Sequence, residues 1–338
     1  SVATDFTKPI SVLAGLKNVL GSSANIVYAK GSNLSNDSLF EERATMFGKT
    51  LHRDSRPAAE LIKEALDAAA KADVIVAALG ESAEMSGESS SRSNIEIPQA
   101  QKDLLAALLK TGKPVVLVLF TGRPLAITWE HENVPAILNV WFGGSEAGNA
   151  IADVLFGDVN PSGKLTATFP QNVGQVPIYY NHKNTGRPLP EGKWFQKFRS
   201  NYLDVSNDPL YPFGYGLSYT TFSYGDVTLS KNQMQPTGKI TASVTVTNTG
   251  TREGKEVVQL YIRDMVGSVA RPVKELKGFQ KISLQPGESK TVSFIISVND
   301  LKFYNSDLKF VAEPGDFKVM IGSNSRDVKE AAFKLLTK

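Results

Sequence analysis

Three glutamates stand close together in the segment from Asp73 to Pro98, DVIVAALGESAEMSGESSSRSNIEIP. Glu81 follows the apolar run directly, and Glu84 and Glu88 come next, among serine and glycine. Loops at the carboxyl ends of strands in open α/β sheets are where such proteins place ligands. Carboxylates there are candidates for proton transfer. Solvated surface charge is the commoner role of an exposed glutamate, and the position after a strand raises the odds of a functional one.

Other patterns that could carry chemistry are weaker. Gly143-Gly144 precede a helical pattern and could offer backbone N–H groups to a phosphate. Neither G-x-G-x-x-G nor a Walker-type motif is present, so a tight strand-to-helix turn with Ser145 as N-cap is favoured. The three histidines lack metal-ligand spacing, which disfavours a metal site; they are His52, His131 and His182. No G-x-S-x-G elbow supports a serine hydrolase.

Aromatic residues are dense between positions 179 and 219. They fall at 179–180, 194–198, 202 and 211–219. Such rings stack on sugar faces, and they also pack between structural elements. Packing is the favoured role, with sugar contact open for one or two of them.

The first part of the chain alternates short apolar runs with helical patterns. The runs at 25–29, 74–79, 115–120 and 136–141 are apolar on both faces, as parallel strands covered by helices are. The helices are expected at 56–72, 98–113 and 145–157. Leu61, Ile62, Ala65, Leu66 and Ala69 form one apolar stripe of the first, Pro98 is expected at the first helical position of the second with Gly112 as its C-cap, and Gly157 is expected to close the third. This order predicts an α/β sandwich with a mostly parallel, doubly wound sheet over residues 1–170.

A change in composition follows. Residues 171–221 have no sustained period and are predicted to be an irregular linker and aromatic loop region. Residues 222–338 are predicted to be an all-β sandwich of fibronectin type III-like or immunoglobulin-like form, without a disulfide. Its expected strands include 240–250, 256–264, 289–297 and 315–323.

Composition narrows the class of function. The chain has 338 residues, with 37 Lys and Arg against 34 Asp and Glu, and lacks the concentrated basic stripe that nucleic acids require. Cysteine is absent, which excludes disulfides, thiolate metal sites and a cysteine nucleophile. The longest apolar runs are strand-sized, so no membrane span is expected. The start at Ser1 reads as a processed or truncated end.

Long stretches resemble the C-terminal two-thirds of glycoside hydrolase family 3 β-glucosidases of the bacterial periplasmic kind. The stretches are GKPVVLVLFTGRPLAI (112–127), ILNVWFGGSEAGNAIADVLFGDVNPSGKLTATFP (137–170), YPFGYGLSYTTFSY (211–224), VTNTGTREGKEVVQLYI (246–262) and RPVKELKGFQKISLQPGES (271–289). The resemblance covers nearly the whole chain.

The resemblance implies a TIM barrel, an α/β sandwich and a fibronectin type III-like domain, of which only the last two are expected here. It implies that an Asp nucleophile lies on the missing barrel and that an acid/base Glu lies on the loop 80–97. Glu88 is closest to the family position, Glu81 is second and expected to be structural, and Glu84 is third. Arg92 could orient the loop or contact the sugar. No cofactor and no metal are implied.

The function implied is hydrolysis of terminal non-reducing β-D-glucosyl residues with retention, on a β-glucoside or oligosaccharide, with the barrel of the same protein as partner. The resemblance also implies a periplasmic or secreted location. This chain alone is expected to be inactive. Two alternatives stay open: a non-catalytic carbohydrate-binding or interaction module, and, more remotely, nucleotide binding at Gly143-Gly144.

Overall fold

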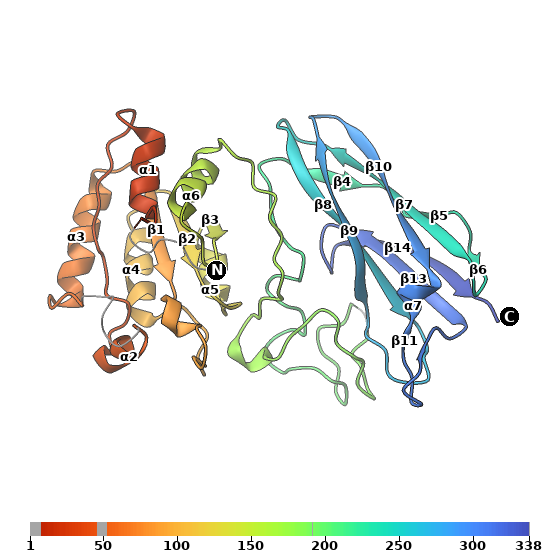
Figure 1. The fold of residues 1–338 in the computed structure, drawn as a ribbon. Coiled ribbons are helices and arrows are strands. Elements are labelled where there is room, and N and C mark those ends of the chain that lie inside the picture. The colour runs from red at the N-terminus through yellow and green to blue at the C-terminus, as the bar shows by residue number, and fades with distance from the viewer. Residues whose placement is uncertain (1–7, 46–52, 191, 338) are drawn as a thin grey trace. The chain divides into compact units, whose positions relative to one another are not determined.

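The computed structural model describes residues 8–45, 53–190 and 192–337, and Figure 1 shows their fold. The chain divides into two compact units. The first, called the α/β unit below, holds the described residues of 1–159 together with 170–176. The second, called the β-sandwich unit, holds residues 160–169 and the described residues of 177–338. The expected boundaries after residues 170 and 221 stay predictions.

A three-stranded parallel sheet forms the centre of the α/β unit (Figure 1), in the order β1 (Ile75–Gly80), β2 (Val115–Phe120), β3 (Ala136–Asn139). Inward side chains of β2 such as Leu117 and Leu119 are fully buried. The helices are α1 (Val12–Leu20), α2 (Ser38–Arg43), α3 (Ala58–Ala70), α4 (Gln99–Leu109), α5 (Thr128–Asn133) and α6 (Ala147–Phe156). The parallel sheet with helices confirms the predicted fold class of this part.

The expected helices all form. In α3 the buried residues are Leu61, Ala65 and Ala69, on the predicted stripe. Helix α4 has Pro98 as its N-cap and Lys110 as its C-cap, so the assignments of Pro98 to the first helical position and of Gly112 to the C-cap were wrong. Gly157, in a left-handed conformation (φ 83°), is the C-cap that closes α6, as predicted. The N-cap of α6 is Glu146, so the assignment of Ser145 to that position was wrong.

The expected strand at 25–29 is wrong, since residues 25–30 form no strand. Two apolar side chains of this run, Val27 and Tyr28, are 43% and 67% exposed. An inner parallel strand needs cover on both faces, and this run does not have it.

Helices α1 and α6 pack at very close range. A Cβ added to Gly15 of α1 would lie 2.0 Å from the carbonyl oxygen of Gly148 in α6, and one added to Gly148 would lie 2.1 Å from the Ser11 oxygen. The two backbones can approach in this way because neither glycine has a side chain.

Two antiparallel sheets form the β-sandwich unit. One has the order β10-β7-β4, with β5 also paired to β7, and the other has the order β6-β14-β13-β8-β9, in which only β6 and β14 are parallel. The strands are β4 (Phe222–Tyr224), β5 (Thr228–Leu229), β6 (Gln233–Met234), β7 (Lys239–Asn248), β8 (Gly254–Asp264), β9 (Glu275–Leu284), β10 (Ser289–Ser297), β13 (Gly315–Gly322) and β14 (Val328–Leu335). A short pair, β11 (Phe303–Tyr304) and β12 (Phe310–Val311), and the turn α7 (Val298–Leu301) complete it.

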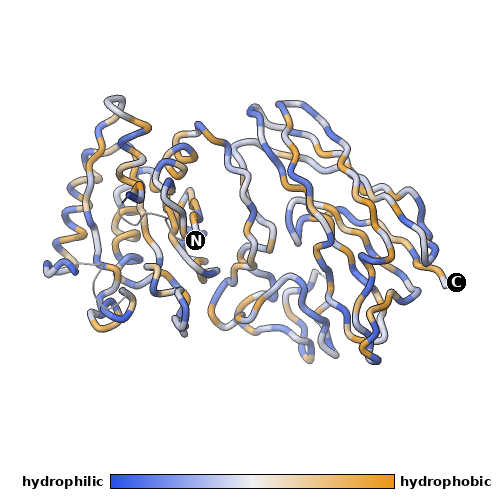
Figure 2. The backbone as a smooth tube through the Cα atoms, in the orientation of Figure 1, coloured by the Kyte–Doolittle hydropathy of each residue, from blue (hydrophilic) through white to orange (hydrophobic). Residues whose placement is uncertain are grey.

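Alternating residues explain this core. Hydrophobic and hydrophilic positions alternate along the long strands (Figure 2), and in β7 the even-numbered residues Ile240 to Val246 are buried while the odd-numbered ones face outward. Residues of both sheets, including Val258 and Val292, meet in one apolar cluster. The predicted all-β sandwich is therefore confirmed.

Candidate active-site loop

The candidate loop leaves the sheet where β1 crowds against β2. Gly80 has φ of 132°, and a Cβ there would lie 1.8 Å from the Phe120 oxygen. Only glycine fits this approach. The pairing continues one residue further, since the N–H of Glu81 donates to the Phe120 oxygen at 2.8 Å. Gly80 thus brings the Glu81 side chain to the carboxyl end of β2.

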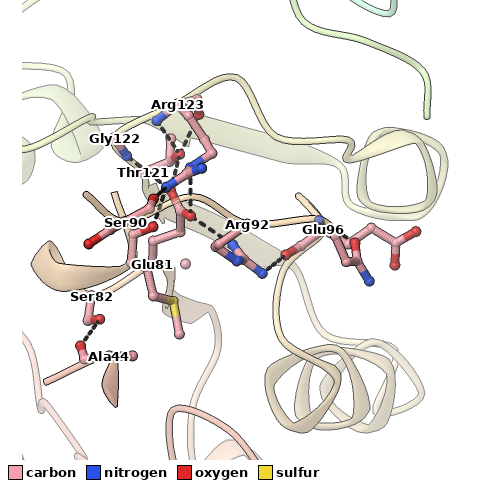
Figure 3. Close-up of polar contacts among 12 residues, drawn as sticks. Ala44, Glu81, Ser82, Ser90, Arg92, Glu96, Thr121, Gly122 and Arg123 are labelled. Carbon is pink, nitrogen blue, oxygen red and sulfur yellow. Dashed lines mark hydrogen bonds and ion pairs between the residues drawn. The ribbon is translucent and has the colours of Figure 1, made fainter. Parts of the chain in front are cut away.

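Glu81 is the buried centre of a polar network (Figure 3), and its side chain is 0% exposed. Its Oε1 accepts from Arg92 Nη1 at 2.7 Å and lies 3.1 Å from Arg123 Nε. Its Oε2 accepts from the N–H of Gly122 at 3.2 Å and lies 3.1 Å from the Thr121 hydroxyl. A carboxylate paired in this way balances the charges of the two arginines inside the fold.

Glu88 has the opposite environment. It lies in the turn that follows the short 3-10 segment η2 (Ala83–Met85), and it is exposed. Among the described residues its carboxylate has no ion pair or hydrogen bond. The turn is closed by the N–H of Ser90, which donates to the Gly87 oxygen at 3.2 Å. The neighbouring Ser89 has a positive φ of 61°, a conformation that is uncommon outside glycine and costs energy.

The other residues singled out from the sequence lie in various places. Glu84 is half-buried in η2, with its Oε2 3.7 Å from a Cβ built on Gly87. The side chain of Arg92, beside the buried Glu81, is only 10% exposed, and its Nη2 also donates to the backbone carbonyl oxygen of Glu96 at 2.9 Å. Glu81, Glu84, Glu88 and Arg92 are thus parts of one loop. Arg123, which lies outside this loop, was not predicted from the sequence to be a site residue. The only sequence sign of Arg123 is its place in the stretch TGRP directly after β2.

The glycine pair and two of the three histidines lie at exposed positions. Gly143 and Gly144 are exposed, and the Glu146 carboxylate stands at the start of α6, where it would oppose a phosphate. His131 and His182 are exposed, and His52 lies outside the described residues. In the described part of the chain no group of His, Cys, Asp and Glu could hold a metal ion. Nor is any described helix long and apolar enough to cross a membrane.

The aromatic region divides into packed and exposed rings. Tyr180 stacks on Phe213 at a centroid distance of 4.4 Å, and Tyr211 stacks on Tyr215 at 5.1 Å. Burial raises the pKa of the Tyr211 hydroxyl to about 12. Between Tyr180 and Tyr211 in the sequence, Trp194, Phe198 and Tyr202 are exposed. Packing therefore accounts for the rings at 180 and 211–215.

Two cavities lie elsewhere on the chain. One of about 370 Å³ is lined in the β-sandwich unit by residues such as Lys231 and Leu336, and one of about 160 Å³ is lined in the α/β unit by residues such as Arg53 and Arg56. Neither is lined by the loop 81–97. Each wall mixes polar and apolar residues, and neither brings two carboxyl groups together.

Comparison with known proteins places this loop in a family of enzymes that cleave glycosidic bonds. Residues 1–219 match the family model described as Glycosyl hydrolase family 3 C-terminal domain, and residues 256–325 match a Fibronectin type III-like domain. The chain belongs to glycosyl hydrolase family 3.

Curated relatives with named activities are longer than this chain. A periplasmic beta-glucosidase of Salmonella typhimurium is 55% identical over 99% of this chain, which spans 44% of its length. A beta-xylosidase of Formosa agariphila is 44% identical over 94% of the chain and 40% of its own length. The crystal structure of a beta-glucosidase from Listeria innocua in complex with isofagomine gives a TM-score of 0.85 at 38% identity, covering 98% of this chain and 43% of that one. The chain thus spans less than half of these relatives.

Proposed function

We propose that this chain supplies the general acid/base, Glu88, of a retaining β-glucosidase that acts on terminal non-reducing β-D-glucosyl residues. The observation that carries the proposal is the contrast within one loop of a family 3 chain. Glu81 forms ion pairs with Arg92 and Arg123 inside the fold. Glu88 is exposed on a turn closed by a backbone hydrogen bond, and no described group forms an ion pair or a hydrogen bond with its carboxylate. A general acid must reach the substrate directly, so a free carboxylate on a fixed turn suits that role.

The second carboxylate of the reaction would come from outside this chain. Retaining glycosidases use a nucleophile and an acid/base about 5–5.5 Å apart. In the proposed mechanism an Asp on a barrel of the same protein attacks the anomeric carbon and the C–O bond to the leaving group breaks. Glu88 gives its proton to the departing oxygen. It then takes a proton from the water that attacks the glycosyl-enzyme bond, which releases glucose and restores both carboxyl groups.

A hybrid enzyme tests the proposal. The N-terminal part of the Salmonella relative is joined to this chain, which replaces its matching 336 residues. We expect the hybrid to hydrolyse 4-nitrophenyl β-glucoside and Glu88→Gln to lower turnover by roughly 10²–10⁴, the usual contribution of a general acid/base. Added azide should restore turnover of 2,4-dinitrophenyl β-glucoside by Glu88→Gln and yield β-glucosyl azide, since azide needs no base.

Matched variants show which glutamate of the loop acts as the acid/base. Glu84→Gln should keep most of the activity and show no azide rescue. If Glu84→Gln and not Glu88→Gln shows both the loss and the rescue, the assignment to Glu88 is wrong. A folded hybrid without β-glucosidase activity would contradict the proposed function itself.

A β-xylosidase is the second candidate, because the Formosa relative with that name is 44% identical to this chain. The full-length protein that carries this chain would then prefer 4-nitrophenyl β-xyloside over the β-glucoside. We also propose that the purified chain by itself is inactive, since it would lack the nucleophile. Measurable turnover of 4-nitrophenyl β-glucoside by the chain would contradict this.

A periplasmic or secreted location is part of the proposal. It is supported by the similarity to the periplasmic beta-glucosidase of Salmonella and by the absence of any cysteine that could mispair in an oxidising compartment. Osmotic-shock fractionation of the source cells should release the protein with periplasmic markers or find it in the medium. Retention with cytoplasmic markers would contradict it.

A further inference from the structure

Arg123 reaches across to the turn that carries Glu88. It lies just after β2, and its Nη2 donates to the carbonyl oxygen of Ser90 at 2.9 Å and also to that of Met85. These two carbonyls stand on either side of Glu88 in the chain. Met85 is itself buried, 2% exposed, which fixes the first of the two points. One guanidinium group therefore holds both ends of the turn.

The guanidinium is in turn held by the buried Glu81. Arg123 Nε lies 3.1 Å from Glu81 Oε1, and the Arg123 side chain is 21% exposed. The same carboxylate binds Arg92, which also donates to the backbone carbonyl oxygen of Glu96, near the end of the loop. Figure 3 shows Glu81 between the two arginines. The loop is thus tied to the sheet before and after Glu88.

The turn needs this support. Ser89, adjacent to Glu88, has a positive φ, and such a conformation persists only where its surroundings impose it. Close packing adds to the constraint, because a Cβ on Gly122 would lie 2.0 Å from Ser86 Oγ. Serine-rich sequence with a central glycine would otherwise leave the segment mobile.

We propose that Arg123 is a positioning residue for the acid/base, acting by clamping the 85–90 turn at the Met85 and Ser90 carbonyls. This inference rests on the proposed function of Glu88. Proton transfer needs the carboxyl within about 2.6–3.2 Å of the leaving oxygen, and a displacement of about 1 Å can cost 10²-fold in rate. Lysine could not replace arginine fully, because a single ammonium lacks the planar fork that serves the carbonyls and Glu81 together.

The first test uses the chain as it is. Hydrogen exchange of peptides that cover 85–92 is measured for the native chain, Arg123→Lys, Arg123→Ala and the control Arg56→Ala, whose ion pairs with Asp54 and Glu64 lie elsewhere in the same unit. We expect exchange in this segment to rise about tenfold or more in both Arg123 variants and to be unchanged in the control. Unchanged exchange in a folded Arg123→Ala chain would overturn the clamp.

The second test separates positioning from general stability in the hybrid enzyme. Values of kcat/KM are compared for phenyl β-glucoside, whose leaving group needs a proton, and 2,4-dinitrophenyl β-glucoside, whose leaving group does not. We expect Arg123→Lys and Arg123→Ala to lower the phenyl value roughly tenfold to 10²-fold more than the dinitrophenyl value, because only the first depends on the placed acid. Equal losses on both substrates would mean that Arg123 merely stabilises the fold.

Glu88→Ala serves as the internal reference. If Glu88→Ala shows the leaving-group dependence and the Arg123 variants do not, the positioning role of Arg123 is wrong, while the proposed function of Glu88 stands. If Glu88→Ala itself shows no such dependence, the proposed function fails. Arg123→Lys, which keeps the charge beside Glu81, decides the matter should Arg123→Ala not fold.

Discussion

Glu81 and Glu88 belong to the same short loop, yet the side chain of Glu81 is 0% exposed between two arginines and that of Glu88 is exposed without a described partner. The two carboxylates divide the work of the loop. One holds the backbone in place from within, and the other is free to meet something outside. This division gives a direct prediction about stability.

Glu81→Gln should destabilise the α/β unit, whereas Glu88→Gln should not. Removing one partner of a buried ion pair typically costs about 3–5 kcal/mol, and partial exposure of Arg92 and Arg123 brings our expectation nearer to about 2–3 kcal/mol. An exposed side chain without contacts changes stability by less than about 0.5 kcal/mol. Chemical denaturation of the chain, followed by hydrogen exchange in β1 and β2, measures both. Equal effects of the two variants would contradict this division of roles.

Much of the fold could be predicted from periodicity and turn residues. The alternation in β7 and the apolar stripe of α3 are local signals, and each is borne out by burial in the structure. The run at 25–29 has the same local signal as β2, and its failure to form a strand depends on missing cover, which is a property of the packing.

The candidate site is predictable only in part for the same reason. The glutamate loop is visible because it follows an apolar run. The contact of Arg123 with Ser90 joins positions 33 residues apart, and it depends on the parallel pairing of β1 with β2. Nothing in the spacing of the residues signals that one arginine after β2 would reach the turn after β1.

Glu130 gives a prediction about pH. It is buried in α5, 1% exposed, and its Oε1 has no hydrogen-bond partner among the described residues. Burial raises the pKa of the Glu130 carboxyl above its ordinary 4.5, and the charges that act on it are Lys102, which lowers the pKa, and Glu96, which raises it. The folded state therefore binds this proton more tightly than the unfolded state does.

The direction in which stability changes with pH follows from this difference in proton affinity between the two states. Stability due to the protonated Glu130 is fully present below pH 4.5 and is lost as pH rises from there through the folded pKa. Glu130→Gln, which stays neutral, should match the native chain at pH 4 and be more stable at pH 7 by on the order of 1 kcal/mol. Denaturation across this pH range measures the gap, with the exposed Glu132→Gln as control. A gap that shrinks as pH rises would reverse the interpretation.

Gly15→Ala should separate α1 from α6. The added Cβ would meet backbone atoms of Gly148, which cannot rotate away, so overpacking should cost about 1–3 kcal/mol. Alanine gains only about 1 kcal/mol in helix propensity over glycine, and the net effect should be a loss. Thermal unfolding of the chain measures it. Gly144→Ala is the control, since nothing lies within 4 Å of its Cβ, and a Gly15→Ala chain as stable as this control would refute the close contact.

Asn248→Ala should destabilise the β-sandwich unit strongly. The residue is fully buried at the end of β7, and its Oδ1 accepts from Thr220 Oγ1 at 2.7 Å and from the Gly250 N–H at 3.1 Å. Its Nδ2 donates to the carbonyl oxygens of Arg252 and Leu284 at 2.8 and 3.0 Å. One side-chain amide therefore forms hydrogen bonds with three parts of the chain: the residues before β4, the turn between β7 and β8, and the end of β9. Each buried group left without a partner costs roughly 1–3 kcal/mol, so we expect a loss of at least about 2 kcal/mol.

The measurement for Asn248→Ala is denaturant unfolding followed by hydrogen exchange in β7 and β10. Thr291→Ala is the matched control, because Thr291 is exposed on β10 and its hydroxyl lies 3.4 Å from that of Thr245, which is also exposed. It should change stability by less than about 0.5 kcal/mol. Asn248→Asp keeps the two accepting bonds, but it turns an acidic oxygen toward the Arg252 and Leu284 carbonyl oxygens in a buried site, so at neutral pH it should destabilise the unit at least as much as Asn248→Ala. If Asn248→Asp were as stable as the native chain, the donated bonds to Arg252 and Leu284 would not contribute to the stability of the turn.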